Sequence, residues 1–134
     1  MSKSLIQVAN QSTQAVAENS IISLGSVIRR FGCNCRLSGN AIEISGGGYY
    51  KIDGSVTVEP TAAGTVTVAV YDNGTQLTGA IASGEVAAAG DPVTLPLMGT
   101  VRQGCGCEGA ENITLVLLAG AGNVTNVSLR IDKA

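Results

Sequence analysis

Four cysteines are the residues of this chain with the clearest chemical potential, and they come as two Cys-x-Cys pairs. Cys33 and Cys35 lie in RRFGCNCRLSGN, and Cys105 and Cys107 lie in RQGCGCEGAEN. The two pairs have the same internal spacing, so antiparallel pairing that puts Cys33 opposite Cys107 also puts Cys35 opposite Cys105. Directly opposed residues lie ~4.5–5.5 Å apart at Cα, which a disulfide can span. The spacing predicts the nested disulfides Cys33–Cys107 and Cys35–Cys105.

Other states of these thiols stay open. Four thiolates at the corners of a strand pair can close a tetrahedral zinc site, although structural zinc sites usually use Cys-x₂-Cys. Unbonded thiols can pack as small apolar groups. A chain that folds in a reducing compartment disfavours disulfides, an objection that a virion protein escapes after lysis. A catalytic thiol is disfavoured because the sequence has no histidine to activate it, leaving Arg29, Arg30 or Arg102 as the available neighbours.

The composition of the 134-residue chain argues against most classes of enzyme and against nucleic-acid binding. Histidine and tryptophan are absent, which removes the commonest general base and metal ligand. We therefore expect no catalytic residue and no cofactor. The eight Lys and Arg residues are scattered, so they form no basic stripe for phosphates. Charged residues are only 13% of the chain, which indicates a surface partly covered by a partner or by further copies.

Alternation of apolar and polar residues with period two recurs in short blocks separated by turn-forming residues. In YYKIDGSVTVEP, the even-numbered residues from Tyr50 to Val58 are apolar on one side of an extended strand. GTVTVAVYDNGTQL repeats the pattern and carries the turn sequence Asp72-Asn73-Gly74, which predicts a hairpin. The pattern predicts a single all-β domain of about nine or ten strands, a sandwich or jelly roll, over residues 21–134.

Residues 1–20 are expected to be an N-terminal arm or a first strand followed by a loop. They contain no apolar core of signal-peptide length, and no stretch of the chain approaches the ~20 apolar residues that span a bilayer. We therefore expect synthesis in the cytoplasm and no membrane contact. Leu5, Ile6 and Val8 are the apolar residues of this segment, and they are candidates for a strand that adds to a capsid protein or a neighbouring subunit.

The order of motifs resembles that of a bacterial and phage family of small domains. The shared features are Gly48-Tyr49-Tyr50, the turn Thr61–Gly64 before a Val/Thr strand, and Asn123–Val127 near the end. The family has a tumour-necrosis-factor-like (TNF-like) jelly roll and supplies phage head-fibre or head-decoration proteins. It also supplies the C-terminal heads of collagen-like spore-surface proteins, although this chain has no Gly-X-Y tract.

The resemblance implies a non-enzymatic, homotrimeric structural protein of the virion that attaches to the major capsid protein or another virion protein. The block ENITLVLLAG is apolar on both faces, which is typical of a strand in the middle of a sheet or at a subunit interface. By the likeness to the trimeric family, its residues are candidates for the axial contact: Ile113, Leu115, Val116, Leu117 and Leu118.

A second function from a different class is recognition of carbohydrate on a host surface. Sugar sites usually need an exposed aromatic cluster, and the chain has only four aromatic residues. Tyr49 and Tyr71, both on the polar sides of their predicted strands, are the candidates. A glycan-binding module would need these two rings to come together.

Overall fold

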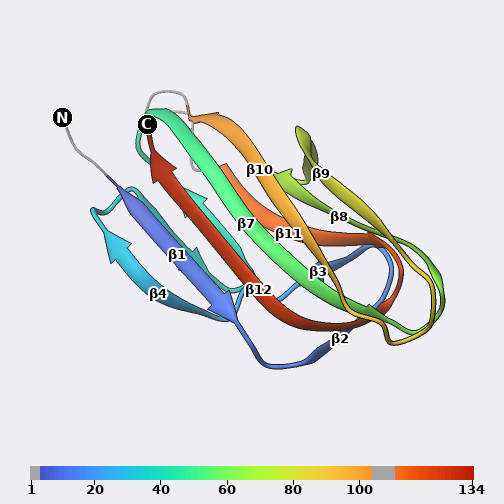
Figure 1. The fold of residues 1–134 in the computed structure, drawn as a ribbon. Coiled ribbons are helices and arrows are strands. Elements are labelled where there is room, and N and C mark those ends of the chain that lie inside the picture. The colour runs from blue at the N-terminus through green and yellow to red at the C-terminus, as the bar shows by residue number, and fades with distance from the viewer. Residues whose placement is uncertain (1–3, 104–110) are drawn as a thin grey trace.

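The computed structural model describes residues 4–103 and 111–134, and within these ranges the chain consists of strands and turns (Figure 1). No helix in this part of the chain has the length and apolar character needed to cross a membrane. The all-β prediction is confirmed. The short strands at Gln14–Val16 and Cys35–Ser38 are additional to the strands that the sequence predicts. The strands are β1 (Leu5–Asn10), β2 (Gln14–Val16), β3 (Ser20–Ile22), β4 (Ser26–Phe31), β5 (Cys35–Ser38), β6 (Ala41–Ile44), β7 (Gly48–Pro60), β8 (Gly64–Asp72), β9 (Thr75–Val86), β10 (Val93–Gln103), β11 (Glu111–Ala119) and β12 (Gly122–Lys133).

Two antiparallel sheets pack face to face. The first sheet has the order β10-β7-β12-β1-β4, with β2 paired to β12, and the second has the order β5-β6-β11-β8-β9, with β3 paired to β11. The long strands β7 and β12 lie side by side in the first sheet, and β8 and β11 lie behind them in the second (Figure 1). The chain therefore crosses repeatedly between the layers, and most contacts that hold the fold are distant in sequence.

The core lies between the sheets and follows the period-two alternation. Tyr50, Ile52, Val56 and Val58 of β7 are completely buried, as their spacing predicts. The Tyr50 hydroxyl donates a hydrogen bond of 2.6 Å to the backbone oxygen of Gly46, so its polar end is satisfied inside the fold. The same alternation places the apolar residues of β8 and β12 inward: Val66, Val68 and Val70, and Val127, Leu129 and Ile131.

The turn between β8 and β9 is the one that Asp72-Asn73-Gly74 predicts. Asn73 and Gly74 have φ values of 50° and 84°, which these two residue types accept more readily than others. The Asn73 backbone amide donates to Asn112 O at 2.9 Å, and its side-chain oxygen accepts from the Asn112 amide at 2.9 Å. The turn therefore also anchors the beginning of β11.

The N-terminal segment is an integral part of both sheets. Strand β1 lies between β12 and β4, and the Ile6 and Val8 side chains are completely buried. Strands β2 and β3 continue the segment into the first and second sheets. The expected first strand in residues 1–20 agrees with β1, but the loop expected after it contains β2 and the beginning of β3, so the segment is not separate from residues 21–134. The prediction of an attachment arm formed by Leu5, Ile6 and Val8 is not supported, because β1 is already paired with β12 on one side and with β4 on the other.

Candidate interaction surfaces

Cys35 is a buried thiol at the start of β5, whereas Cys33 is exposed in the turn before it. Burial raises the pKa of Cys35 to about 11; the Arg30 guanidinium opposes this rise and the Asp132 carboxylate adds to it. At neutral pH Cys35 is therefore a protonated thiol that packs as a small apolar group, unsuited to act as a nucleophile. Arg30 Nε donates to Cys35 O at 2.9 Å, which ties β4 to β5 through the backbone.

The predicted disulfides and the zinc site depend on Cys105 and Cys107, which lie outside the described residues, so both remain predictions. Cys35 is on a strand whose partner is β6, with Cys35 opposite Ile44. Strand β10, which ends just before the second cysteine pair, belongs to the other sheet and pairs with β7. Among the residues that the structure describes, no three His, Cys, Asp or Glu side chains gather in a way that could hold a metal ion.

The five residues predicted to form the trimer contact divide between the two faces of β11. Ile113, Leu115 and Leu117 are completely buried in the core of their own subunit, so they cannot contact a second subunit. For these three the interface prediction is wrong, because the doubly apolar pattern marks a central strand of the second sheet. Val116 alternates with the core residues and lies on the outer side of that sheet, whereas Leu118 lies at a shift in the pairing of β11 with β8 and is partly buried.

Val116 belongs to an apolar row across the outer face of the second sheet. It is opposite Ile21 on β3 and opposite Ala69 on β8, and Ala69 is in turn opposite Ile81 on β9. Ile21 and Ile81, at the two ends, are 51% and 44% exposed, while the two middle side chains are nearly covered by their neighbours. The accessible apolar area on this face is therefore small and split between its margins.

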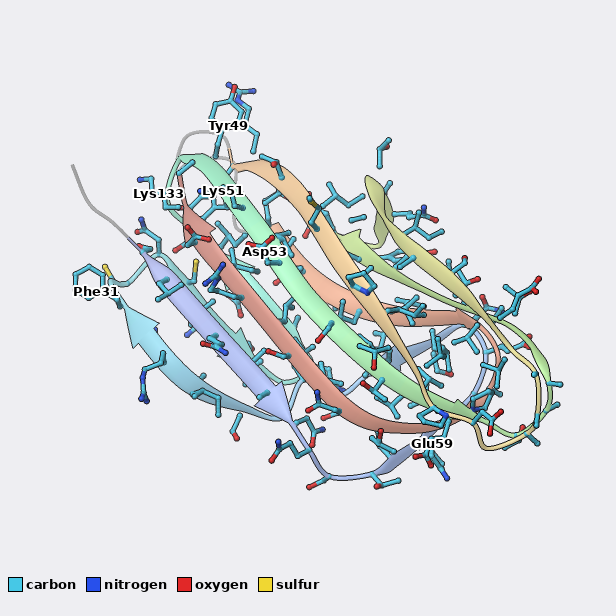
Figure 2. The ribbon with its side chains drawn as sticks, in the orientation of Figure 1. Phe31, Tyr49, Lys51, Asp53, Glu59 and Lys133 are labelled. Atoms are coloured by element: carbon cyan, nitrogen blue, oxygen red, sulfur yellow. The ribbon has the colours of Figure 1, made fainter. Side chains whose placement is uncertain are left out.

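The outer face of the first sheet is polar and carries paired charges. Arg130 Nη2 lies 3.3 Å from Asp53 Oδ2, and Lys51 Nζ lies 4.0 Å from Asp132 Oδ2, both between β7 and β12. Lys51, Asp53 and Glu59 follow one another along this side of β7 (Figure 2). All four paired side chains are substantially exposed, so the pairs contribute little to the stability of the subunit.

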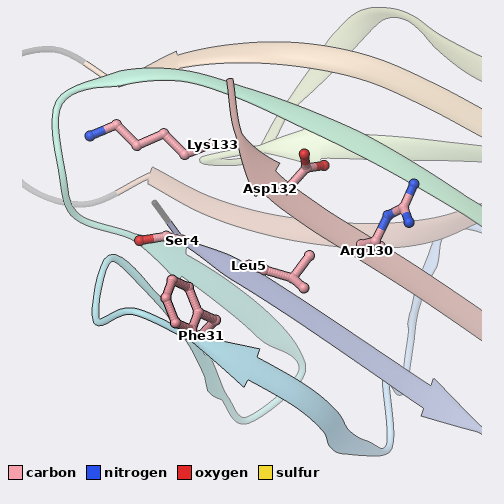
Figure 3. Close-up of a pocket in the computed structure, with 6 residues that line it drawn as sticks. All are labelled: Ser4, Leu5, Phe31, Arg130, Asp132 and Lys133. Carbon is pink, nitrogen blue, oxygen red and sulfur yellow. The ribbon is translucent and has the colours of Figure 1, made fainter. Parts of the chain in front are cut away.

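A hollow of about 410 Å³ lies at the β1–β4 margin of this face. The exposed ring of Phe31 at the end of β4 stands beside Leu5, its partner residue on β1 (Figure 3). Arg130 and Asp132 border the same hollow from β12, with Ser4 and Lys133 at its end. Phe31 is 63% exposed, a large fraction for a side chain of its size.

A second hollow, of about 500 Å³, lies at the opposite margin, where β9 and β10 are the adjacent edges of the two sheets. Pro96 and Met98 line it from β10, Ile81 lines it from β9, and Asp53 borders it from β7. Met98 is 65% exposed. The sequence pattern did not single out Met98 or Phe31 as surface residues of interest. A signal was present for Met98, because it is an apolar residue at a polar-face position of its strand.

Asp72 and Glu111 form a carboxyl pair beside the β8–β9 turn. Partial burial raises the pKa of Asp72 to about 7, and a hydrogen bond with Glu111 and the negative charge of Glu111 act in the same direction. Asp72 Oδ1 is buried and has no hydrogen-bond partner among the described residues. Glu111 Oε2 accepts from Asn73 Nδ2 at 2.6 Å. Close carboxyls of this kind hold a proton between them at moderate pH.

The two tyrosines proposed as a sugar platform do not come together. Tyr49 is 57% exposed on the outer side of β7 in the first sheet. Tyr71 is half-buried on the outer side of β8 in the second sheet. The outer faces of two packed sheets point in opposite directions, so these rings cannot contact the same sugar.

Comparison with solved structures identifies the fold. Murine APRIL at pH 5.0 superposes with a TM-score of 0.75 at 12% identity, covering 99% of this chain and 100% of that one. The chain has a TNF-like jelly-roll fold. Eiger TNF from S. frugiperda (TM-score 0.71, 8% identity, 98% and 91% coverage) and the globular domain of zebrafish complement 1qA protein (0.71, 8%, 98% and 96%) also match.

No family model and no curated protein matches the sequence. At identities of 8–13% the likeness to these solved structures concerns the arrangement of strands alone. Binding residues and partners of those proteins therefore cannot be transferred to this chain. The surface features described above are the basis for a function.

Proposed function

We propose that the chain is a non-enzymatic structural subunit, a homotrimer that decorates a phage head or forms part of a short head fibre. The observation that carries the self-assembly is the pair of hollows at opposite margins of the first sheet. One is built around Phe31 and the other around Met98, and these are the two most exposed large apolar side chains among the described residues. Burying them would remove apolar area from water at both ends of the same face.

Two different patches on one subunit favour a ring. A contact between the Phe31 hollow of one subunit and the Met98 hollow of its neighbour is heterologous. Repeating this contact produces a closed ring when the rotation between neighbouring subunits divides a full turn. Three subunits is the number that the sequence resemblance and the TNF-like fold support. The charges on the face between the patches are largely neutralised in the pairs Arg130–Asp53 and Lys51–Asp132, which lowers the cost of covering that face.

Attachment to a capsid is supported by the motifs shared with phage head-fibre and head-decoration domains. Gly48-Tyr49-Tyr50 begins β7, Thr61–Gly64 connects β7 to β8, and Asn123–Val127 lies in β12. A small trimer on a regular lattice binds through many repeated weak contacts, so it needs neither a catalytic residue nor a cofactor. The proposed partner is the major capsid protein or another virion protein, and the proposed location is the virion.

The first experiment is native mass spectrometry of the purified chain at micromolar concentration. A species of three times 13.5 kDa is expected, and a monomer at all concentrations would contradict the trimer.

The second experiment is co-sedimentation of the trimer with phage heads that lack it, scored by saturation at a fixed number of trimers per head. A trimer that stays in the supernatant would contradict decoration while leaving the assembly intact.

A further inference from the structure

Strand β4 (Ser26–Phe31) is an open edge of the first sheet. It pairs with β1 on one side, and no other strand in the described part of the chain pairs with it. The backbone amides and carbonyls of β4 that do not bond to β1 therefore face away from the sheet. All six of its residues are exposed, in contrast to the mixed burial of the neighbouring strand β1. Such an edge can accept a further strand by backbone hydrogen bonding.

Strand β4 has two features that can protect an edge from pairing, the adjacent charges of Arg29 and Arg30 and a register shift that leaves Ile28 without a partner on β1, but it lacks two others. Natural edge strands are often interrupted by proline or covered by another element. Strand β4 has no proline and no covering strand among the described residues, and apart from Phe31, which is assigned to the trimer contact, Val27 and Ile28 are 40% and 46% exposed. An incoming strand with apolar residues at alternate positions would cover some of this area on each side of the sheet.

The charge of β4 indicates what kind of strand fits. Arg29 and Arg30 are adjacent, and the strand contains no carboxylate. Arg29 Nη1 donates to Ile28 O at 3.1 Å and Arg30 Nε donates to Cys35 O at 2.9 Å, and neither guanidinium takes part in an ion pair within the described residues. On a chain with a net charge of −2, this edge is a local concentration of unneutralised positive charge.

We propose that the edge of β4 binds an extended, acidic segment of another protein, which adds to the first sheet as a sixth strand of its main path. A second copy of this chain is the less favourable occupant, because antiparallel pairing of β4 with itself brings the arginines of the two copies close together, and like charges across a strand pair are destabilising. The contact uses the backbone of β4, whereas the proposed trimer uses side chains on the outer face, among them Phe31 at the end of this strand. The inference therefore goes beyond the trimer and does not depend on attachment to a capsid.

The test uses the full-length protein, labelled for amide NMR, and a capped hexapeptide of alternating valine and glutamate as the probe. Its matched control is the same peptide with lysine in place of glutamate. The acidic peptide is expected to slow hydrogen exchange of alternate amides in β4 at least tenfold, because only outward amides gain a partner. The lysine peptide is expected to leave these amides unchanged.

Two variants separate strand addition from general attraction between charges. In the double variant Arg29→Glu/Arg30→Glu, the acidic peptide is expected to bind at least tenfold more weakly and the lysine peptide to bind more tightly. Arg102→Glu changes an exposed charge on β10, the edge at the opposite margin of the same sheet, and is expected to bind like the parent. These comparisons are made at low ionic strength, where surface charges are least screened.

Three results would overturn the proposal. If the acidic peptide leaves the exchange of the β4 amides unchanged, the edge does not accept a strand. If both peptides protect these amides equally, the acidic character of the partner is wrong. If alternate amides are already protected without peptide, and increasingly so at higher protein concentration, the occupant is a second copy of the chain.

Discussion

At the scale of single residues, Asp72 couples folding to pH. Its folded pKa of about 7 lies above its ordinary value of 3.8, so the native state binds a proton more tightly than the unfolded chain does. Its contribution to stability is complete below about pH 4 and is lost as pH rises through 7. Asp72→Asn is therefore expected to raise the free energy of unfolding at pH 8 by about 1 kcal/mol, a figure reduced for solvent screening of this partly exposed group.

Urea denaturation of both proteins at pH 4.5, 6 and 8 measures this effect. The parent should lose stability relative to Asp72→Asn across that range, because only the parent must ionise a carboxyl next to Glu111. Asp53→Asn is the matched control, since Asp53 is an exposed partner of Arg130 and its removal should not raise stability at pH 8. Parallel pH curves for the parent and Asp72→Asn would show that the two carboxyls do not share a proton.

The two Cys-x-Cys pairs show what residue types alone can and cannot predict. The absence of histidine disfavours a catalytic thiol, and the raised pKa of Cys35 provides a structural reason for the same conclusion. Spacing could not show that Cys35 begins a strand of the second sheet while β10 belongs to the first, because sheet membership depends on contacts distant in sequence. The predicted bonds from Cys33 and Cys35 to the second pair remain to be tested.

At the scale of strands, the pairing of β7 with β12 depends on a residue without a side chain. Gly54 lies opposite Leu129 in the middle of β7, and a Cβ there would lie 2.5 Å from Ser128 O and 2.9 Å from Leu129 Cδ1. Gly54→Ala should therefore destabilise the subunit by about 1–3 kcal/mol through overpacking. Thermal unfolding followed by circular dichroism measures the loss. The neighbouring variant Ser55→Ala, on the outer side of β7, should stay within about 0.5 kcal/mol of the parent.

Period-two alternation predicted the strands well because burial on one face imposes it directly. It correctly assigned the buried residues of β7 and β8, and the Asn-Gly turn between β8 and β9. It could not distinguish a central strand from an interface strand at 113–118, since both are apolar on two sides. A related limit made β1 a candidate arm. The sequence of a strand does not show whether its backbone already pairs with other strands on both sides, as β1 does with β12 and β4.

At the scale of the whole molecule, the two hollows of the first sheet predict how assembly can be broken and restored. Phe31→Asp and Met98→Asp each place a charge in one hollow at a highly exposed position, so each variant should fold normally. Each is expected to be monomeric by native mass spectrometry, because every contact of a ring needs both patches. Ile21→Asp, on the outer face of the second sheet, is the matched control and should remain trimeric.

Mixing the two monomeric variants distinguishes a ring from a twofold contact. Phe31→Asp keeps an intact Met98 patch and Met98→Asp keeps an intact Phe31 patch, so one sound interface can form between them. The mixture is expected to give a heterodimer that does not close, at twice the subunit mass of 13.5 kDa. A contact between identical patches would give only a homodimer of one variant. If Ile21→Asp is instead the variant that dissociates, the row through Val116 on the second sheet is the interface, and the assembly proposed for the first sheet is wrong.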